Sequence, residues 1–561
     1  MNRFAEMHAA PDAEVEGWQG RKFTDGDFSL NYRIKLPADI NDGKIHPLVL
    51  SMHGAGSIGN DNLKQLYLAT LFADNNAAVA AASPIIVAPQ CPEGQYWVPI
   101  APDWQAKEIP LQREPARALA AVMDLMEKLL GELPVDFTRV YVIGCSMGGF
   151  AAWELLFRRE WFAAAVIVCG AGDPEKLGGI TSVALKLFHG TLDTVVPVSN
   201  SRMMCERFQK IRGNVEYTEY PDVYHDSWGK AFADPETARW LFAQKRRTVL
   251  ECRTGIRETV RLSAHGFTAE IVPEIGGNLF RLRDPNGRAL LREPHSLDEL
   301  SSACVCFGIP TLFPPNRIDG GKFTFRGREC SLPVTEPRNN NALHGLAANQ
   351  PWQVVHQDAE SAVLRYAFTA ADPRHAGFPF TFTMTHAYRL LPDGLEDVMT
   401  VRNDGQEIMP LGLGYHTAFP ADGVKLRMGT AEYEIAPNGR NLPTGENRPW
   451  RENDPRTLFD PAGHSFDLHT PARPLQRENG EPLHGAELHY PDGVLIYETD
   501  EKFGFWYTWN AGGYNRFVCI EPVSWMCNTL NLRLPPETTG LRELAPGAEV
   551  SFRNRLRWQP A

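Results

Sequence analysis

The stretch VYVIGCSMGGFAAW, residues 140–153, places one polar side chain, Ser146, between two glycines and directly after four residues that favour an extended chain. Residues 140–143 predict a buried strand and residues 149–159 predict a helix, so Ser146 falls at the turn between them. Gly144 and Gly148 lack the side chains that would collide if the strand met the helix at a tight elbow. The pattern indicates a nucleophile elbow, although a short G-x-S-x-G string also fits an ordinary glycine turn.

Residues 1–247 have the alternation of short apolar strands and helical stretches that is typical of a mostly parallel sheet covered by helices. In residues 115–130 the apolar side chains fall on one helical face, and Pro115 suits the first turn. The predicted strands are Leu48–Met52, Ile85–Ala88, Val140–Ile143, Ala164–Val168, Leu185–Phe188 and Val215–Tyr220. This half is therefore predicted to be a three-layer α/β domain.

Residues 248–561 have a different pattern, with short alternating strands and almost no amphipathic helix. Turn signals such as PNG at 285–287 and PDG at 491–493 separate the strands. The second half is predicted to be all-β. A chain of 561 residues is also too long for one hydrophobic core, which agrees with a division into two domains.

Three residues in the first half suggest acyl transfer by a serine, which needs a base and a carboxylate that orients the base. Asp193 follows the strand that ends at Phe188, and His225 follows the strand that ends near Tyr220. Each lies beyond the carboxyl end of a strand, where ligands collect in open sheets. The order Ser146, Asp193, His225 predicts a catalytic triad. Asp226 competes as the orienting acid, but a carboxylate adjacent to the histidine in sequence rarely reaches its ring, so Asp193 is preferred.

The oxyanion of acyl transfer needs hydrogen-bond donors, which we expect to be the backbone N–H groups of Met147 and Ala55. Residues 54–59 of the same loop, GAGSIG, also satisfy the dinucleotide pattern G-x-G-x-x-G. The next strand ends in IIVAPQ without an acidic residue that would hold a ribose, so this interpretation is rejected. No cofactor is expected.

The segments HPLVLSMHGAGSIGNDN, RVYVIGCSMGGFAAWELLFRREWFAAAVIVCGAGDP, LFHGTLDTVVPVSNS and YTEYPDVYHDSWGKAF cover nearly the whole first domain. They resemble the bacterial carboxylesterase family of α/β-hydrolases, near the polyhydroxybutyrate-depolymerase and feruloyl-esterase relatives. The resemblance implies an α/β-hydrolase fold with Ser146, Asp193 and His225 as its triad. Cys145 departs mildly from the family pattern and is expected to be structural.

Four stretches of the second half carry possible site residues: LFPPNRIDGG, NALHGL, GLGYHTAFPA and CIEPVSW. They resemble aldose 1-epimerases (mutarotases), and the likeness covers most of this half, which implies a galactose-mutarotase-like β-sandwich. By that resemblance Glu521 is the base and His416 the acid, while Arg317, His344 and Asn316 hold sugar oxygens. Mutarotation removes the anomeric proton and protonates the ring oxygen, so a carboxylate and a histidine on opposite sides suit it.

One feature of the mutarotase family is missing from the expected place. Those enzymes usually have a sugar-binding aspartate in a loop before the last strands, commonly next to a histidine, whereas this chain has ENGEPLHGAELHY at 478–490. Glu487 is a possible substitute. Trp506, Trp509 and Trp525 could line a sugar site, although core packing is the stronger expectation for most of them.

The bulk composition limits the partners. The chain has 56 basic and 68 acidic residues, and the net charge of −12 disfavours nucleic acid and anionic membranes. The first twenty residues lack a secretory signal pattern, and the ten cysteines form no C-x-x-C pair, so we expect no metal site and a cytoplasmic location with reduced thiols. The oligomeric state stays open.

Together these features predict a serine carboxylesterase acting on acylated carbohydrate, with acetyl or feruloyl esters of sugars or plant cell-wall oligosaccharides as substrates, fused to a mutarotase-like domain. Two alternatives remain. The protein is mainly an aldose 1-epimerase with an accessory hydrolase, or it is an esterase whose β domain only binds carbohydrate.

Overall fold

The computed structural model describes residues 4, 10–38, 40–41, 43–74, 76–99, 103–106, 109–246, 258–450, 454–462, 464–477, 480–513 and 516–561. The chain forms two compact units, Met1–Arg247 and Thr248–Ala561. The predicted boundary between residues 247 and 248 lies outside the described residues. None of the helices in the described parts of the chain is long and apolar enough to cross a membrane.

The first unit is built on an eight-stranded sheet with the order β1-β2-β4-β3-β5-β6-β7-β8. Its strands are β1 (Gln19–Asp25), β2 (Phe28–Lys35), β3 (His46–Met52), β4 (Ile85–Pro89), β5 (Val135–Cys145), β6 (Ala164–Val168), β7 (Ala184–Gly190) and β8 (Val215–Tyr220). Strands β3 to β8 run parallel, while β1 and β2 are antiparallel additions at one edge. The predicted mostly parallel α/β fold is confirmed, but β1 and β2 were not predicted.

Helices cover both faces of this sheet. They are α1 (Leu66–Ala73), α2 (Ala77–Ala82), α3 (Arg117–Glu132), α4 (Met147–Arg158), α5 (Val198–Lys210), α6 (Trp228–Ala233) and α7 (Pro235–Ala243), with 3₁₀ turns η1 (Ala55–Ser57) and η2 (Pro174–Ile180). Side chains of β5 alternate between two cores, because neighbouring residues of a strand point to opposite faces. Val140 and Val142 belong to the core of α3, α4 and α5, whereas Tyr141 and Ile143 belong to the core of α1, α6 and α7.

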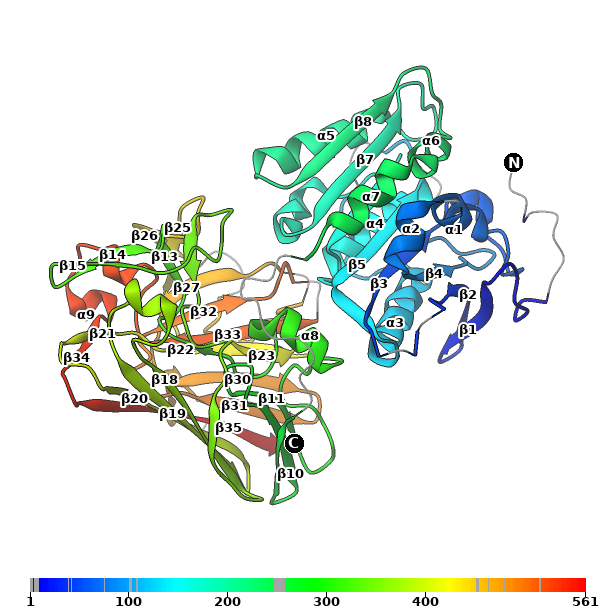
Figure 1. Cartoon of the computed structure of the whole chain (residues 1–561). Helices are drawn as coiled ribbons and strands as arrows, with labels where there is room; N and C mark the ends of the chain where they lie inside the picture. The colour runs from blue at the N-terminus through cyan, green and yellow to red at the C-terminus, as the bar shows by residue number, and fades with distance from the viewer. Residues whose placement is uncertain are drawn as a thin grey trace. The chain divides into compact units, whose positions relative to one another are not determined.

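The second unit is a β-sandwich whose two main sheets appear as stacked layers in Figure 1. One sheet has the order β17 (Gln353–Gln357), β18 (Ser361–Phe368), β19 (Phe382–Leu391), β20 (Gly394–Asn403), β35 (Glu549–Pro560), β31 (Gly493–Glu498), β30 (Gly485–Tyr490), β24 (Lys425–Met428). The other has the order β12 (Thr311–Leu312), β22 (Gly414–Tyr415), β33 (Phe517–Val523), β32 (Phe505–Trp509), β27 (Asp467–Pro471), with β23 (Thr417–Pro420) also paired to β33. The predicted all-β architecture is confirmed.

Shorter elements complete the second unit. They are β9 (Val260–Ala264), β10 (Phe267–Val272), β11 (Asn278–Arg283), β13 (Arg317–Asp319), β14 (Lys322–Phe325), β15 (Arg328–Ser331), β16 (Asn341–Leu343), β21 (Met409–Leu411), β25 (Tyr433–Pro437), β26 (Pro443–Pro449), β28 (Leu475–Gln476), β29 (Pro482–Leu483), β34 (Arg542–Leu544), α8 (Leu297–Ser302), α9 (Pro536–Thr539), η3 (Cys304–Cys306), η4 (Pro373–Ala376) and η5 (Thr529–Asn531). One continuous core joins the two main sheets, with Phe382 and Met399 from one and Trp506 and Ile520 from the other.

Candidate active sites

The turn at Ser146 joins β5 directly to α4. Ser146 has φ +52°, a left-handed backbone conformation that is costly for a residue with a side chain. A Cβ on Gly144 would collide with the carbonyl oxygen of Gly148, and a Cβ on Gly148 would collide with that of Met52. Both glycines are therefore required by close backbone contacts, as the sequence predicted. Ser146 is half-buried while its neighbours are buried, so its hydroxyl is accessible at the amino end of α4.

The structure brings Ser146, His225 and Asp193 together in one hydrogen-bonded chain. The Ser146 hydroxyl donates to His225 Nε2 over 2.8 Å. His225 Nδ1–H donates to Asp193 Oδ2, also over 2.8 Å. The three residues come from loops beyond β5, β8 and β7, whose carboxyl ends meet at one edge of the parallel sheet. This arrangement can remove the proton from a serine hydroxyl and hold the imidazole in the tautomer that accepts it.

A second histidine supports the Asp193 carboxylate. His189 is fully buried; its Nε2–H donates to the Val196 carbonyl over 3.0 Å and lies 3.2 Å from Asp193 Oδ2, while its Nδ1 accepts from the Ser201 hydroxyl over 2.8 Å. The other carboxylate oxygen accepts the backbone N–H groups of Val195 and Val196. Burial alone would raise the pKa of Asp193, but the hydrogen bonds from His189, His225 and Val196 outweigh it and hold the pKa well below its usual range. The carboxylate is thus charged and fixed in place.

Asp226, the competing acid, is exposed, and no hydrogen bond joins its carboxylate to His225 in the described structure. His189 was missed from the sequence because nothing in its strand distinguishes it from a core histidine. The signal that could have found it is its position in β7, four residues before Asp193 on the loop that follows.

The segments of the two expected oxyanion donors, Met147 and Ala55, both lie next to Ser146. Met147 is the first residue of α4, where backbone N–H groups have no partner inside the helix. The loop carrying Ala55 touches the elbow, since a Cβ on Gly54 would lie 3.4 Å from the Ser146 Cβ. His53 anchors this loop: its Nε2 accepts the Cys91 N–H over 2.9 Å, and burial lowers the pKa of His53 to about 4, so it stays neutral.

Two buried thiols lie near this site. Burial raises the pKa of Cys145 to about 12, so it stays a protonated, unreactive thiol. The Cys169 thiol, the Asp193 carboxylate and the His225 ring have atoms within 4.8 Å of one another, a spacing that a metal ion could use. However, burial raises the pKa of Cys169 well above its usual range, and metals bind the thiolate. Because Asp193 and His225 also bond to each other, the cluster does not fit a metal site.

In the second unit, strand pairing places Glu521 next to His416. Glu521 lies on β33, and His416 lies between β22 and β23, which both pair with β33. His416 Nε2 is 3.2 Å from Glu521 Oε1, and both side chains are buried. The residue pair predicted from the sequence is therefore in contact.

The three predicted sugar-binding residues lie on one small ribbon beside this pair. Arg317 begins β13, which pairs with β16, and His344 directly follows β16. The His344 N–H donates to the Asn316 carbonyl over 3.1 Å. The His344 and His416 rings pack edge to face with centroids 5.1 Å apart. Arg317 is held by Glu336, with Nε 3.1 Å from Oε2.

The sequence missed three residues on the same sheet face. Tyr507 pairs with Glu521 across β32 and β33, and His469 pairs with Tyr507 across β27 and β32. Glu521, Tyr507 and His469 therefore lie in one row across the sheet. The His469 and Tyr507 rings stack with centroids 4.2 Å apart. Asp467 lies two residues before His469, on the same face, with its Oδ1 3.9 Å from Arg317 Nη1 and its side chain 38% exposed. Asp467 is thus an accessible aspartate near a histidine, at the site itself.

The charges of this cluster of side chains are shifted by burial. Burial, and then the Asp467 carboxylate, raise the pKa of Glu521 well above its usual range, although Arg317 opposes them. Burial, and then Arg317, lower the pKa of His416 to about 3. Without sugar the pair therefore favours its neutral form. In the neutral form the pair's one proton is on Glu521. For Glu521 to act as base and His416 as acid, that proton must be on His416 instead.

Glu487, the possible substitute for the missing aspartate, does not belong to this site. It lies on β30 in the other sheet and is 2% exposed. Its carboxylate pairs with Arg427 over 2.6 Å, Arg477 over 2.7 Å and His489 over 3.1 Å. The suggestion is wrong because a carboxylate with three cationic or hydrogen-bonding partners is used for structure.

We expect Glu487→Gln to lower the free energy of unfolding by about 3 kcal/mol, because it leaves two half-buried arginines without their buried counter-charge. Burial would raise the pKa of Glu487, but His489, Arg477 and Arg427 bring it down to about 2. Since a depressed pKa stabilises above the unfolded value, the wild-type advantage should disappear as pH falls from about 4.3 towards 2. Urea unfolding of both proteins at pH 7 and pH 3 measures this. An equal difference at the two pH values would contradict it.

The tryptophans divide as expected between core and site. Trp506 and Trp525 are buried, and their indole N–H groups donate to the carbonyls of Gly429 and Pro315. Trp509 is half-buried, and its ring centroid is 5.8 Å from that of His416. Of the three, Trp509 is the one whose ring lies beside that of His416.

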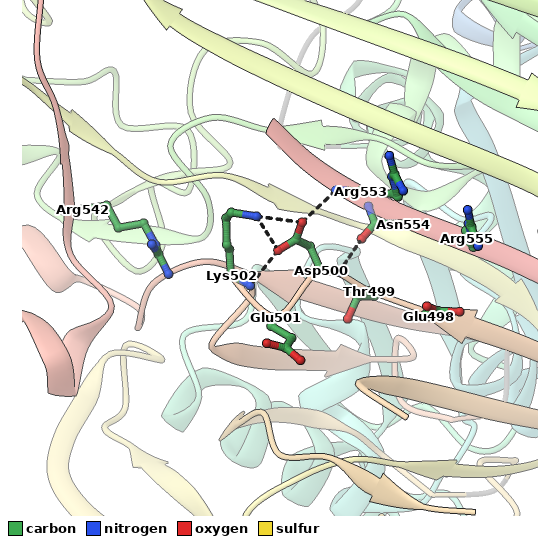
Figure 2. A pocket seen from close by; sticks show the side chains of 9 residues that line it. All are labelled: Glu498, Thr499, Asp500, Glu501, Lys502, Arg542, Arg553, Asn554 and Arg555. Atoms are coloured by element: carbon green, nitrogen blue, oxygen red, sulfur yellow. Dashed lines mark hydrogen bonds and ion pairs between the residues drawn. The ribbon is translucent and has the colours of Figure 1, made fainter. Parts of the chain in front are cut away.

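Another hollow of the second unit, of about 610 Å³, is charged but has its own internal pairing (Figure 2). Lys502 Nζ bonds Asp500 over 2.9 and 3.0 Å, and the Arg553 N–H donates to the same carboxylate. None of the predicted site residues lines it. It is not the sugar site.

The fold and the two groups of side chains define a two-domain protein, with an α/β-hydrolase domain of the carboxylesterase type followed by a mutarotase-like β-sandwich. Family models agree. The aldose 1-epimerase model matches residues 258–557, more than half of the chain, and the phospholipase/carboxylesterase model matches residues 40–237. The chain belongs to the aldose 1-epimerase family and carries a phospholipase/carboxylesterase domain before it.

Individual relatives match parts of the chain. It is 32% identical over 161 residues to the uncharacterized protein YihR of Escherichia coli K12, covering 28% of this chain and 49% of that protein. It is 28% identical over 165 residues to the uncharacterized protein YphB of the same organism, covering 29% and 52%. The chain thus spans about half the length of the curated relatives it matches.

Solved structures resemble each unit. A galactose mutarotase-like protein from Clostridium acetobutylicum is 28% identical with a TM-score of 0.50, covering 54% of this chain and 95% of that one. A thermostable esterase is 33% identical with a TM-score of 0.39, covering 41% and 64%.

Proposed function

We propose that the first unit is a serine carboxylesterase that acts on acylated carbohydrate, with acetyl or feruloyl esters of sugars or plant cell-wall oligosaccharides as substrates. The observation that carries the proposal is the chain of two 2.8 Å hydrogen bonds from Ser146 through His225 to Asp193. The strained φ of Ser146 supports it, because such strain is typical of functional sites.

In the proposed reaction Ser146 Oγ attacks the ester carbonyl carbon while its proton passes to His225 Nε2. The oxyanion accepts hydrogen bonds from the N–H groups of Met147 and Ala55. When the intermediate collapses, the carbon–oxygen bond to the alcohol breaks and His225 returns the proton to the leaving alcohol. Water then gives its proton to His225, attacks the acyl-serine, and releases the carboxylic acid and the free Ser146 hydroxyl.

We propose that the second unit interconverts sugar anomers. Glu521 removes the proton of the anomeric hydroxyl, His416 protonates the ring oxygen, the ring opens, and the same pair closes it on the other face. Arg317 and His344 hold sugar oxygens, with Asn316 and Asp467 beside them. The Glu521–His416 contact of 3.2 Å supports this assignment.

The sugar part of the substrate follows from the fusion, since a triad alone does not name its alcohol. The net charge of −12 disfavours nucleic acid and membrane as partners. We expect the partner to be an ester of a small molecule or oligosaccharide, and the location to be the cytoplasm. A protein that is mainly an epimerase would turn over free sugars far faster than esters. A β domain that only binds would hold sugar without changing its anomer.

A panel of acetylated and feruloylated oligosaccharides tests the proposal. We expect release of acid and free sugar from at least one class, and accelerated mutarotation of fresh glucose or galactose by the same preparation. Binding of sugar without accelerated mutarotation would favour the binding-module alternative. Ester hydrolysis that is absent across the panel would contradict the esterase.

We expect mutarotation to persist to a higher pH than an ordinary glutamate would allow. The active pair, ionised Glu521 with protonated His416, holds one proton, as does the resting pair with Glu521 protonated and His416 neutral, so the rate falls when the pair loses that proton. Burial and Asp467 raise the pKa of Glu521, so the pair keeps its proton well above about pH 4.3, the ordinary value for glutamate. Polarimetry between pH 4 and pH 9, with the spontaneous rate subtracted, measures it. A rate that falls near the ordinary value would contradict the proposed pair.

A further inference from the structure

Three aromatic side chains form a ladder beside Ser146 that the proposed chemistry does not use. The Trp104 ring packs edge-on against Phe150 with centroids 5.3 Å apart. Tyr96 follows on the other side of Trp104, at 6.3 Å. Phe150 is buried, Trp104 is half-buried and Tyr96 is 41% exposed, so the ladder runs from the core of the first unit to its surface. Aromatic rings at the surface can pack against a further ring in an offset or edge-to-face arrangement.

Hydrogen bonds of the Phe150 backbone and of the residues next to Tyr96 and Trp104 connect the ladder segments to the segments of the triad. Phe150 lies one helical turn after Ser146, and its N–H donates to the Ser146 carbonyl over 3.1 Å. Trp97, next to Tyr96, donates its indole N–H to the His53 carbonyl in the loop of Ala55. Gln105, next to Trp104, donates its side-chain amide to the Thr194 carbonyl, adjacent to Asp193. The ladder is therefore tied to the nucleophile helix, the oxyanion loop and the acid loop.

A second observation also points to an apolar ligand. In the described part of the first unit, the large hydrophobic side chains that are exposed are Tyr96, Leu192, Val195 and Tyr224. All four belong to the loops that carry the ladder, Asp193 or His225. Exposed apolar residues that gather in one place mark a binding surface. An acetyl group, with a single methyl, would leave most of this surface in water.

We propose that Tyr96, Trp104 and Phe150 form a subsite for the aromatic ring of the acyl group, so that hydroxycinnamoyl-type esters are hydrolysed in preference to acetyl esters. This inference rests on the proposed esterase function of the same site. We assign the ladder to the acyl group by elimination. The leaving alcohol must take its proton from His225, and the carbonyl oxygen must face Met147 and Ala55, so the acyl chain takes the remaining direction. The ring then extends along the remaining side, between α4 and the loop of Tyr96.

Two p-nitrophenyl esters test the subsite, because p-nitrophenyl acetate and p-nitrophenyl ferulate share one leaving group and differ only in the acyl part. We expect a higher kcat/KM for the ferulate in the wild-type protein. Trp104→Leu should lower kcat/KM for the ferulate about tenfold, while the acetate changes less than twofold. Tyr96→Ala, which truncates an exposed ring, should lower the ferulate value in the same direction.

Trp240→Leu is the matched control, since Trp240 is also half-buried in the first unit but bonds Glu216 near the amino end of β8, at the other edge of the sheet. It should change neither ester. A binding measurement avoids turnover altogether: methyl ferulate added to Ser146→Ala should bind about ten times more tightly than to Ser146→Ala/Trp104→Leu, followed by tryptophan fluorescence.

The outcomes separate the two proposals. An equal loss on both esters in Trp104→Leu, or equal binding of methyl ferulate with and without Trp104, overturns the ring subsite and leaves the esterase standing. Full hydrolysis by Ser146→Ala overturns the esterase itself. A ferulate-specific loss in both Trp104→Leu and Tyr96→Ala supports the subsite, whatever either change does to the melting temperature.

Discussion

Ser146→Ala is expected to lower the rate of ester hydrolysis at least about 10⁴-fold, leaving the low residual rate that the oxyanion donors and substrate binding sustain on their own. The physical reason is that, among the residues the structure describes, the hydroxyl is the one group hydrogen-bonded to His225 Nε2, at 2.8 Å, so its removal leaves the base with no nucleophile to activate. Initial rates with p-nitrophenyl acetate and methyl ferulate measure the loss. Mutarotation by the second unit should be unchanged.

Cys145→Ala is the control for Ser146→Ala, because Cys145 is the adjacent residue of the elbow and the only other side chain there that resembles a nucleophile. Burial keeps Cys145 as a thiol, with a pKa of about 12, so its removal should leave hydrolysis nearly unchanged. Retention of more than about one per cent of the rate by Ser146→Ala, or a large loss in Cys145→Ala, would show that Ser146 is not the nucleophile.

Glu521→Gln is expected to lower the catalysed rate of mutarotation about 10²- to 10⁴-fold. Glutamine has the shape of glutamate but cannot take the anomeric proton, and His416 then loses the partner that lies 3.2 Å away. Polarimetry on freshly dissolved glucose and galactose measures the effect, with the uncatalysed rate subtracted. Circular dichroism and thermal melting of the same variant report whether the second unit is folded, since ester hydrolysis reports on the first unit alone.

Glu543→Gln provides the same chemical change at an exposed ion pair with Arg326. It should leave mutarotation unchanged, because an exposed pair contributes little. If Glu521→Gln were as fast as the wild type, Glu521 would not be the base, and the second unit would be better described as a carbohydrate-binding domain.

Much of the fold could be predicted because the signals are local. Strands β6 and β8 have the predicted bounds, and β3, β4, β5 and β7 contain the predicted strands, since short apolar runs between turns depend on neighbouring residues alone. Helix α3 starts at Arg117, two residues after Pro115, because Ala116 is still extended. Strands β1 and β2 were missed although Asp25-Gly26 marks their hairpin, because their alternation of polar and apolar residues is weak.

The candidate sites divide in the same way. Gly-x-Ser-x-Gly and the chain order of Ser146, Asp193 and His225 are properties of the sequence. Asp467 was missed because it lies far along the chain from Arg317, and only the pairing of β27, β32 and β33 brings it to the face of Glu521. Glu487 was a wrong suggestion for the converse reason, since its place on β30 in the other sheet cannot be read from its neighbours.

The sequence by itself determined where strands β3 to β8 form, why glycine must lie on either side of Ser146, and which residue types could transfer a proton, because these depend on propensity, periodicity and covalent order. Only the tertiary structure decided that His189 supports Asp193, that Asp467 joins Arg317 and Glu521, and that Tyr96, Trp104 and Phe150 meet beside Ser146. Such contacts join residues far apart in the chain, and they depend on strand register and loop closure, which no local pattern specifies.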